Sequence, residues 1–259
     1  MNRTMKNIWA ITKKELRIYF TTPIAYVVAT IFLLLVGILF YLLIREFNSL
    51  SFNAARNPYY YQQLNINQMV YSSLFFWMSL FLLFLLSLLT MRLFSEEKKT
   101  GTDELLYTSP ISINQIILGK YIASLILLTI ILLLTGILSI FSFAYGNPEL
   151  APILSGYLGL FLMGAAFIAV GIFFSSLTEN QIISAILTFG IYFLFLFLYI
   201  ASLFTGGIAK DILNYISFFR HFNDMTRGIL DTADIVYYLS FTFLSLFLTH
   251  SVIQSRRWR

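Results

Sequence analysis

Residues 91–120 read MRLFSEEKKTGTDELLYTSPISINQIILGK and form the longest charge-bearing interruption between two strongly apolar stretches. Thr102 is suited to cap a short helix whose first turn would carry two carboxylates, which the helix dipole favours there. Pro110 ends that helix, because proline disfavours helical geometry at the preceding residue and donates no backbone hydrogen bond. Ser112 and Gln115 then form a capping-box pattern. The stretch therefore predicts helix, charged bend, short surface helix, bend and helix.

Composition indicates an integral membrane protein. Hydrophobic residues make up 59% of the chain and charged residues only 11%, unlike a soluble domain. Its 259 residues suffice for about six spans, because each needs about 20 residues to cross the hydrocarbon core. The absence of cysteine excludes disulfides, thiolate metal sites and cysteine nucleophiles. The chain has a net charge of +5, but its basic residues lie beside the span ends, as membrane orientation requires. No nucleic-acid partner is therefore expected.

The chain divides into an interfacial helix and one six-span transmembrane domain. Residues 1–22 interleave basic and apolar side chains, which is typical of a helix lying on the cytoplasmic surface of the lipid bilayer. A cleaved signal peptide is disfavoured, because the apolar run after Pro23 is of full span length. Residues 23–259 form the transmembrane domain. Its expected spans are about Ile24–Ile44, Met69–Met91, Ile116–Phe143, Ile153–Phe174, Gln181–Phe204 and Ile235–Ile253.

Two features refine this layout. The fourth span is rich in glycine and alanine, which lets helices approach closely, so we expect it inside the bundle. Thr178 and Gln181 have capping-box spacing at the start of the fifth span.

Basic residues predict the orientation. Of the 17 lysines and arginines, only five fall in segments expected outside: Arg45, Arg56, Lys210, Arg220 and Arg227. The positive-inside rule therefore places both termini in the cytoplasm and makes the number of spans even. The expected location is the inner (cytoplasmic) membrane.

Residues 205–234 are too polar to cross a membrane, yet four apolar side chains recur there at roughly helical spacing: Ile212, Ile216, Phe219 and Phe222. This pattern predicts a short helix or helical pair at the outer leaflet, with its apolar face inward. Gly228 is available to break it before the last span. His221 lies near irregularly spaced carboxylates, which is only a weak indication of a metal site.

Motifs for nucleotide or ion chemistry are missing. Gly119 and Lys120 do not belong to a phosphate-binding loop, because Asn114 stands where the earlier glycine is required and Tyr121 where the hydroxyl residue is required. We therefore expect no enzyme activity and no cofactor in this chain. The central portions of the spans carry no ionisable coupling residue, and His250 lies near a span end, which disfavours an ion-coupled secondary transporter.

Four strings resemble the ABC-2 type permease family, especially its gliding-motility-associated and nitrous-oxide-reductase-maturation subfamily. They are EEKKTGTDELLYTSPIS followed by ILGK, KKELRIYFTTPIAYVV at 13–28, SSLTENQIISAILTF at 175–189 and HFNDMTRGILDTADIVYYLS at 221–240. The resemblance covers nearly the whole chain in the expected order. It implies an all-α, type V exporter-like permease fold, with a coupling helix between spans two and three and short external or re-entrant helices before span six.

The resemblance also implies site residues. Residues 92–115 would form the coupling loop that docks on a separate ATPase subunit, through Glu96, Glu97, Lys98, Gly101, Thr102, Glu104, Leu105, Leu106 and Pro110. The second cytoplasmic turn, at Glu179 and Asn180, is a smaller candidate that a plain helix start also explains. The segment 205–234 would cap the translocation path as an external gate.

The function implied is that of the permease subunit of an ABC transporter. Such a subunit pairs with itself or a sibling permease and binds two copies of the ATPase, which hold ATP and Mg²⁺, and the substrate moves outward. One alternative is a membrane anchor that transmits ATP-driven motion to an extracellular partner, together with a further membrane protein that has an extracellular domain. The other is a secondary transporter.

Overall fold

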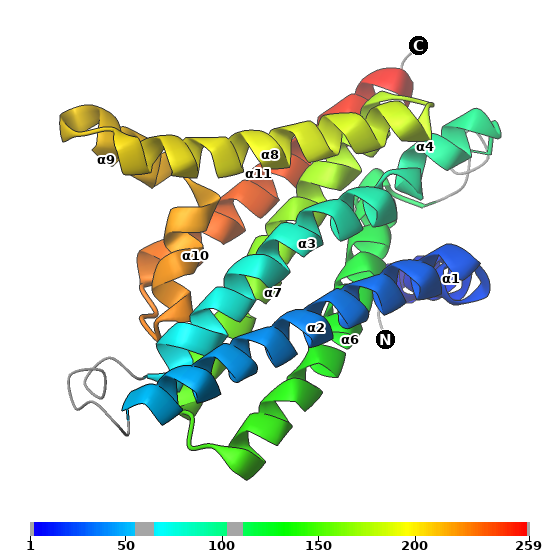
Figure 1. Cartoon of the computed structure of the whole chain (residues 1–259). Helices are drawn as coiled ribbons and strands as arrows, with labels where there is room; N and C mark the ends of the chain where they lie inside the picture. Colours follow the sequence, from blue (N-terminus) through cyan, green and yellow to red (C-terminus); the bar gives the residue numbers. More distant parts are fainter. Residues whose placement is uncertain (1–2, 55–64, 103–110, 258–259) are drawn as a thin grey trace.

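The computed structural model describes residues 3–54, 65–102 and 111–257, and the regular secondary structure in these ranges is helical (Figure 1). In chain order the helices are α1 (Arg3–Thr21), α2 (Pro23–Ala54), the short π-helix η2 (Asn67–Ser72), α3 (Ser73–Thr90), α4 (Arg92–Lys99), α6 (Ile113–Tyr145), α7 (Leu150–Leu177), α8 (Gln181–Phe204), α9 (Gly207–Ile216), α10 (Phe218–Thr226) and α11 (Thr232–Arg257).

Among the described residues, six helical stretches are long and apolar enough to cross a membrane. They are α2, the run from η2 through α4, α6, α7, α8 and α11, so the expected all-helical fold with six spans is confirmed. Two boundaries differ from the prediction. Helix α2 continues past Ile44 to Ala54, and α4 prolongs the second span to Lys99. Neither extension contains glycine or proline, so polar residues alone do not end the helix.

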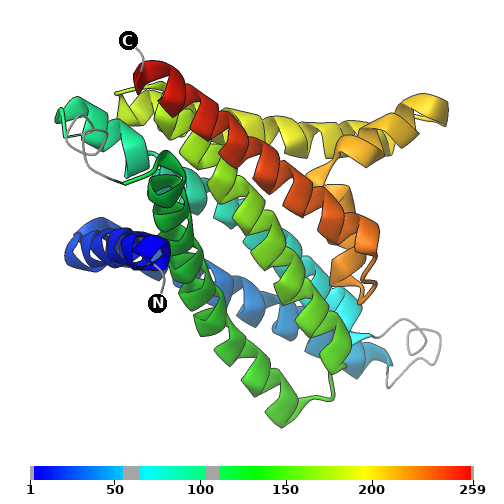
Figure 2. The same ribbon diagram turned by 180° about the vertical axis from the view of Figure 1, so that it is seen from behind.

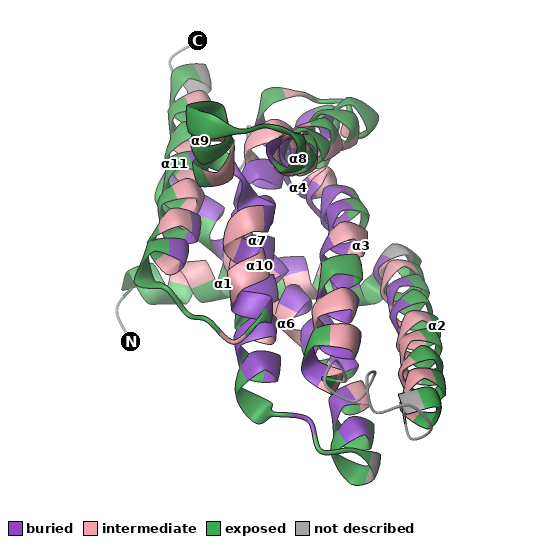
Figure 3. Cartoon of the chain, turned by 60° about the vertical axis from the view of Figure 1, so that its left-hand side comes forward, coloured by how far each residue is buried: buried purple, intermediate pink, exposed green. Residues whose placement is uncertain are grey.

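Helix α7 forms the centre of the bundle. In its most apolar stretch 72% of the residues are buried, against 11% in α2, and Figure 3 shows buried residues along α7 and α3 while α2 and α9 are largely exposed. Its small residues allow close contacts with neighbouring helices. An added Cβ would lie 2.2 Å from the Phe75 ring at Gly156 and 2.1 Å from Thr90 Oγ1 at Gly171. The expectation that the fourth span packs inside the bundle is confirmed.

The two ends of the bundle differ in character. Figures 1 and 2 place α1, α4 and the C-terminal end of α11 at one end, and α10 with the turn between α6 and α7 at the other. Helix α1 packs mainly against α6. The ion pairs that join different helices at the first end lie between α1, α4 and α6.

The expected helical pair before the last span is present as α9 and α10, but its single apolar face is not. Phe219 and Phe222 are buried, whereas Ile212 and Ile216 are 55% and 43% exposed. The chain leaves helical geometry at Ser217 (φ −79°, ψ 118°), so the helical period of α9 does not continue into α10. Helix α10 ends at Thr226, and Gly228 follows with φ +87°, which is the break that the sequence predicts.

Helix starts follow the sequence in one place and depart from it in another. Ser112 and Gln115 form the expected capping box of α6. The expected box of Thr178 and Gln181 is wrong, because Asn180 caps α8: its side-chain oxygen accepts from the N–H of Ile182 at 2.9 Å. Asn180 directly precedes the first helical residue, which is the position from which a side chain reaches the free N–H groups.

Candidate functional site

The end of α4 forms a tight turn at the edge of the described residues. Gly101 has φ +67°, its N–H bonds to the Lys98 carbonyl at 3.2 Å, and the N–H of Thr102 bonds to the Glu97 carbonyl at 3.0 Å. This pair of bonds around a left-handed glycine is the Schellman ending of a helix. Gly101 therefore supplies the predicted bend, while the hydroxyl of Thr102 donates to the Glu97 carbonyl at 3.3 Å.

The rest of the predicted coupling helix lies outside the described residues, and with it Glu104, Leu105, Leu106 and Pro110. Within the described part, Glu96, Gly101 and Thr102 are exposed, Glu97 is partly buried and Lys98 is buried. The predicted contact residues thus separate into an exposed group and a group that faces the bundle.

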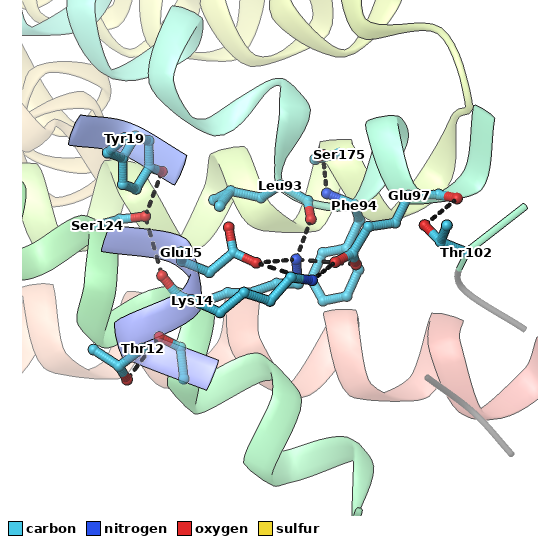
Figure 4. Close-up of polar contacts among 12 residues, drawn as sticks. Thr12, Lys14, Glu15, Tyr19, Leu93, Phe94, Glu97, Thr102, Ser124 and Ser175 are labelled. Atoms are coloured by element: carbon cyan, nitrogen blue, oxygen red, sulfur yellow. Dashed lines mark hydrogen bonds and ion pairs between the residues drawn. The ribbon is translucent and has the colours of Figure 1, made fainter. Parts of the chain in front are cut away.

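Glu97, from the group that faces the bundle, belongs to a cluster of four charged side chains. This cluster is here called the charged junction and consists of Lys14, Glu15, Glu97 and Lys120. Lys120 Nζ lies 2.9 Å from Glu15 Oε1 and 3.0 Å from Glu97 Oε2. Lys14 Nζ lies 2.9 Å from Glu97 Oε1. The residues come from α1, α4 and α6, and Figure 4 shows the side chains of Lys14, Glu15 and Glu97 converging. The junction therefore joins three helices that are far apart in sequence.

Lys120 is the centre of this cluster. Its side chain is only 2% exposed, and an ammonium group that is withdrawn from water costs several kcal/mol unless it is paired and hydrogen-bonded. Besides the two carboxylates, Nζ donates to the Leu93 carbonyl at 2.6 Å, which gives three acceptors for its three N–H groups. The Phe94 ring centroid lies 5.0 Å from Nζ, within cation–π range. Lys120 is therefore a satisfied buried cation.

Lys14 completes the charge balance from the surface. Its side chain is 53% exposed. Partial burial lowers its pKa, but the hydrogen bond with Glu97 and the charges of Glu97 and Glu15 outweigh this, so the pKa is raised. The junction then holds two cations and two carboxylates, a net charge of zero, which suits its low exposure.

The end of α7 fixes α4 from the opposite side. Ser175 Oγ accepts hydrogen bonds from the backbone N–H groups of Phe94 at 2.9 Å and Ser95 at 3.1 Å, and donates to the Met91 carbonyl at 2.9 Å. Lys98 Nζ donates to the Ser176 carbonyl. First-turn N–H groups of a helix need acceptors, so Ser175 serves as a cap supplied by another helix.

Helix α1 is fastened to α6 along its length. The two backbones approach closely at Gly119, where an added Cβ would lie 2.7 Å from Ile11 Cγ2. Thr12 Oγ1 donates to the Gly119 carbonyl at 3.1 Å. The Tyr19 hydroxyl lies 3.1 Å from Ser124 Oγ, and burial raises the Tyr19 pKa to about 12. Polar contacts between α1 and the bundle therefore extend beyond the charged junction.

Sequence reasoning missed Lys14, Glu15, Lys120 and Ser175 as site residues. Two signals point to part of this set. Lys120 stands two turns inside an apolar helix, where a charge needs a partner, and Glu15 is the only carboxylate before position 46. At the second turn, Glu179 is exposed and Asn180 caps α8, which matches the plain helix start.

Six apolar helices among the described residues, with an amphipathic first helix fastened to them, indicate an integral membrane protein. Residues 9–253 match the ABC-2 family transporter proteins, and the chain belongs to this family. Over 137 residues it is 28% identical to the probable multidrug ABC transporter permease YbhR of Escherichia coli strain K12, and equally to that of E. coli O157:H7. The match covers 52% of this chain and 37% of the relative.

Proposed function

We propose that the chain is the permease subunit of an ABC exporter, powered by a separate ATPase that docks on residues 92–115. The charged junction is the observation that carries this proposal. It fixes α4, the last described helix before residues 103–110, to α1 and α6, and Ser175 fixes it to α7. A displacement applied beyond Gly101 then moves the bundle itself, because packed helices transmit strain.

The transmission follows from the contacts. Glu97 passes a displacement of α4 to Lys120 on α6, and Glu15 passes it to α1. Helix α7, held by Ser175, packs against α11, α3, α10 and α8. Two such subunits, either two copies of this chain or this chain with a sibling permease, would rock against each other when two ATPase copies close on ATP and Mg²⁺.

The segment 205–234 is proposed as the external gate. Phe219 and Phe222 anchor α10 in the core, while Ile212 and Ile216 on α9 stay exposed. Gly228, with its positive φ, provides a hinge between α10 and α11. Because most lysines and arginines lie in the segments assigned to the cytoplasm, the positive-inside rule places both termini there, and this segment then faces outward from the inner membrane.

The four strings quoted above support assignment to the gliding-motility-associated and nitrous-oxide-reductase-maturation subfamily, whereas the E. coli relative is named as a multidrug permease. In the subfamily reading, a force-transmitting anchor is the second candidate function. Copurification of a large extracellular partner without substrate-stimulated ATPase activity would favour the anchor. Substrate-stimulated ATPase activity in the reconstituted complex would favour the exporter.

Docking is tested by charge reversal at Glu96, which is exposed, and at Glu104, which lies outside the described residues. We expect Glu96→Lys and Glu104→Lys to weaken copurification of the ATPase from native membranes, each by up to about fivefold, since an exposed ion pair contributes up to about 1 kcal/mol. Glu46→Lys, an exposed reversal at the far end of α2, is the matched control. Glu97→Lys is unsuitable for this test, because it also breaks the charged junction. Unchanged association in the Glu96→Lys, Glu104→Lys double variant would refute docking here.

Orientation is tested separately with reporters. A reporter fused after Arg259 should be cytoplasmic, and one inserted near Asn57 should be external. The opposite result at both sites would reverse the topology.

A further inference from the structure

A second polar cluster, at the opposite end of the bundle, joins α9, α10 and α11. His221 on α10 has a side chain that is only 13% exposed, and its Nδ1 lies 2.6 Å from Asp234 Oδ1 on α11. Its Nε2 lies 3.1 Å from the backbone carbonyl oxygen of Tyr215 on α9. The Tyr237 ring stacks on the imidazole with centroids 4.2 Å apart. These four residues, Tyr215, His221, Asp234 and Tyr237, are here called the latch.

The latch requires a particular number of protons. A carboxylate oxygen and a carbonyl oxygen are both acceptors, so each ring nitrogen of His221 faces an acceptor. A neutral imidazole carries one N–H and donates one hydrogen bond. Both contacts form together only when the His221–Asp234 pair holds a second proton, either on the imidazole or on the carboxyl group.

Losing that second proton acts on one helix in particular. The charge of Asp234 keeps the last N–H on Nδ1, because hydrogen bonds to a charged acceptor are the stronger ones. Nε2 then presents a lone pair to the Tyr215 carbonyl at 3.1 Å, and two acceptors repel each other. Helix α9 has no buried residue. Besides the His221 contact it packs on α8, and the Tyr237 hydroxyl donates to the Ile216 carbonyl at 2.5 Å, so the lost bond removes one of two side-chain hydrogen bonds that hold the end of α9 to α10 and α11 among the described residues.

We propose that the His221–Asp234 pair is a proton-binding site that fastens the end of α9 to α10 and α11, and that loss of the proton releases α9. Histidine is the side chain whose charge ordinarily changes between pH 5 and 8, so the test below covers that range. The latch is closed at acidic pH and opens as the pH rises. The inference goes beyond the proposed function and rests on it only for which compartment supplies the proton.

Buried polar atoms support the proposal independently. Asp234 is 5% exposed, and its Oδ2 has no hydrogen-bond partner among the described residues. A buried carboxylate oxygen without a partner is costly, and a positive imidazolium beside it, or a proton on the carboxyl group, reduces that cost.

The surroundings hold few competing charges. On α10 itself, Arg220 and Asp224 pair with each other at 2.5 Å. Tyr237 from α11 and Tyr215 from α9 are the other titratable groups that face the imidazole. The sequences of α7, α8 and η2, which also pack on α10, contain no charged residue. Asp234 is therefore the charged partner of His221 among the described residues.

The proton count is tested directly by nuclear magnetic resonance. The chain has two histidines, so His250→Gln leaves His221 as the only imidazole signal. With ¹⁵N-labelled histidine in detergent micelles, we expect a change in ring protonation or tautomer between pH 5 and 9, ending with the proton on Nδ1. Asp234→Asn should change this behaviour, because it removes the carboxylate that accepts from Nδ1. An imidazole that keeps one protonation state and one tautomer throughout would overturn the proposal.

The release of α9 is tested with a buried reporter. The chain lacks cysteine, and Ser217, between α9 and α10, is fully buried. Maleimide labels Ser217→Cys in purified protein, and the rate is divided by that of Ile208→Cys, which is 80% exposed, to cancel thiol ionisation. We expect the ratio to rise about fivefold from pH 5.5 to pH 8.5, the effect of one lost hydrogen bond.

The control is the same ratio in the Asp234→Asn background, which should be low and independent of pH in this range, because the amide introduced at position 234 can donate to Nδ1 and leaves Nε2–H for the Tyr215 carbonyl. A constant low ratio in the unmodified latch would refute release, whatever the outcome of the ATPase experiments. Neither measurement requires transport or the partner, so failure of the latch and failure of the proposed function are distinguishable.

Discussion

Replacing Lys120 with methionine removes the centre of the charged junction while keeping a side chain of similar length. Glu15 then retains only Lys14 Nζ, at 3.9 Å, and Glu97 retains Lys14 at 2.9 Å. The Leu93 carbonyl loses its 2.6 Å donor. Because the variant leaves a buried carboxylate without its main partner, we expect a loss of about 3–5 kcal/mol in the free energy of unfolding. The remaining pairing with Lys14 favours the lower end of this range.

The measurement is unfolding of the purified protein by sodium dodecyl sulfate in mixed micelles, followed by circular dichroism. Lys14→Met is the matched control, because Lys14 is half exposed and its screened ion pair contributes about 0–1 kcal/mol. A second substitution, Glu15→Met, in the Lys120→Met protein should recover most of the lost stability, since an apolar replacement of a buried pair is often nearly neutral.

Two results would refute this reasoning. One is equal, small losses for Lys120→Met and Lys14→Met, which would mean that the junction is solvated. The other is a further loss on adding Glu15→Met, which would mean that Glu15 contributes through contacts other than the ion pair.

Three more variants test the packing around this site. Gly171→Ala places a Cβ 2.1 Å from Thr90 Oγ1, so the free energy of unfolding should fall by about 1–3 kcal/mol. Gly190→Ala, with open space around it, should change it little. Equal effects of the two variants would contradict close packing of α3 on α7. Ser175→Ala leaves two N–H groups of α4 without their acceptor, with an expected loss of about 1–3 kcal/mol and faster hydrogen exchange there. The Tyr19 pKa is about 12 in the folded protein, above its ordinary value of 10.0. The contribution of neutral Tyr19 to the stability of the fold is therefore complete below about pH 10 and is lost as the pH rises through about 12. Tyr19→Phe should lack this part of the alkaline loss of stability, and identical pH profiles for the two proteins would contradict this.

Much of the architecture follows from local sequence. A span is recognised from its own length and hydropathy, because lipid forces each crossing segment to satisfy its backbone internally. The same holds for the glycine at position 101, which ends α4 with a positive φ, and for the Ser112 capping box. These features depend on a few neighbouring residues, so a sequence pattern predicts them.

Predictions that assumed one continuous period were less successful. Ile212, Ile216, Phe219 and Phe222 share a helical spacing, but the break at Ser217 separates them onto two helices. The predicted end of the first span, at about Ile44, lies before the end of α2 at Ala54. Polarity at Arg45 and beyond predicts the end of the helix, yet exposed polar residues form helix readily when neither glycine nor proline intervenes.

The sequence by itself determined the six spans, the amphipathic first helix, the charged bend and the missing nucleotide motif, because each is encoded within one segment. Only the tertiary structure decided which charges are structural. Glu15 and Lys120 are separated by 105 residues, and no local sequence pattern around either residue predicts that they pair. Their pairing arises because α1, α4 and α6 converge at one point, where a buried ammonium group must find carboxylates from whichever helices reach it. The same holds for the latch, whose proton requirement exists only because α9 and α11 present two acceptors to the two nitrogens of His221.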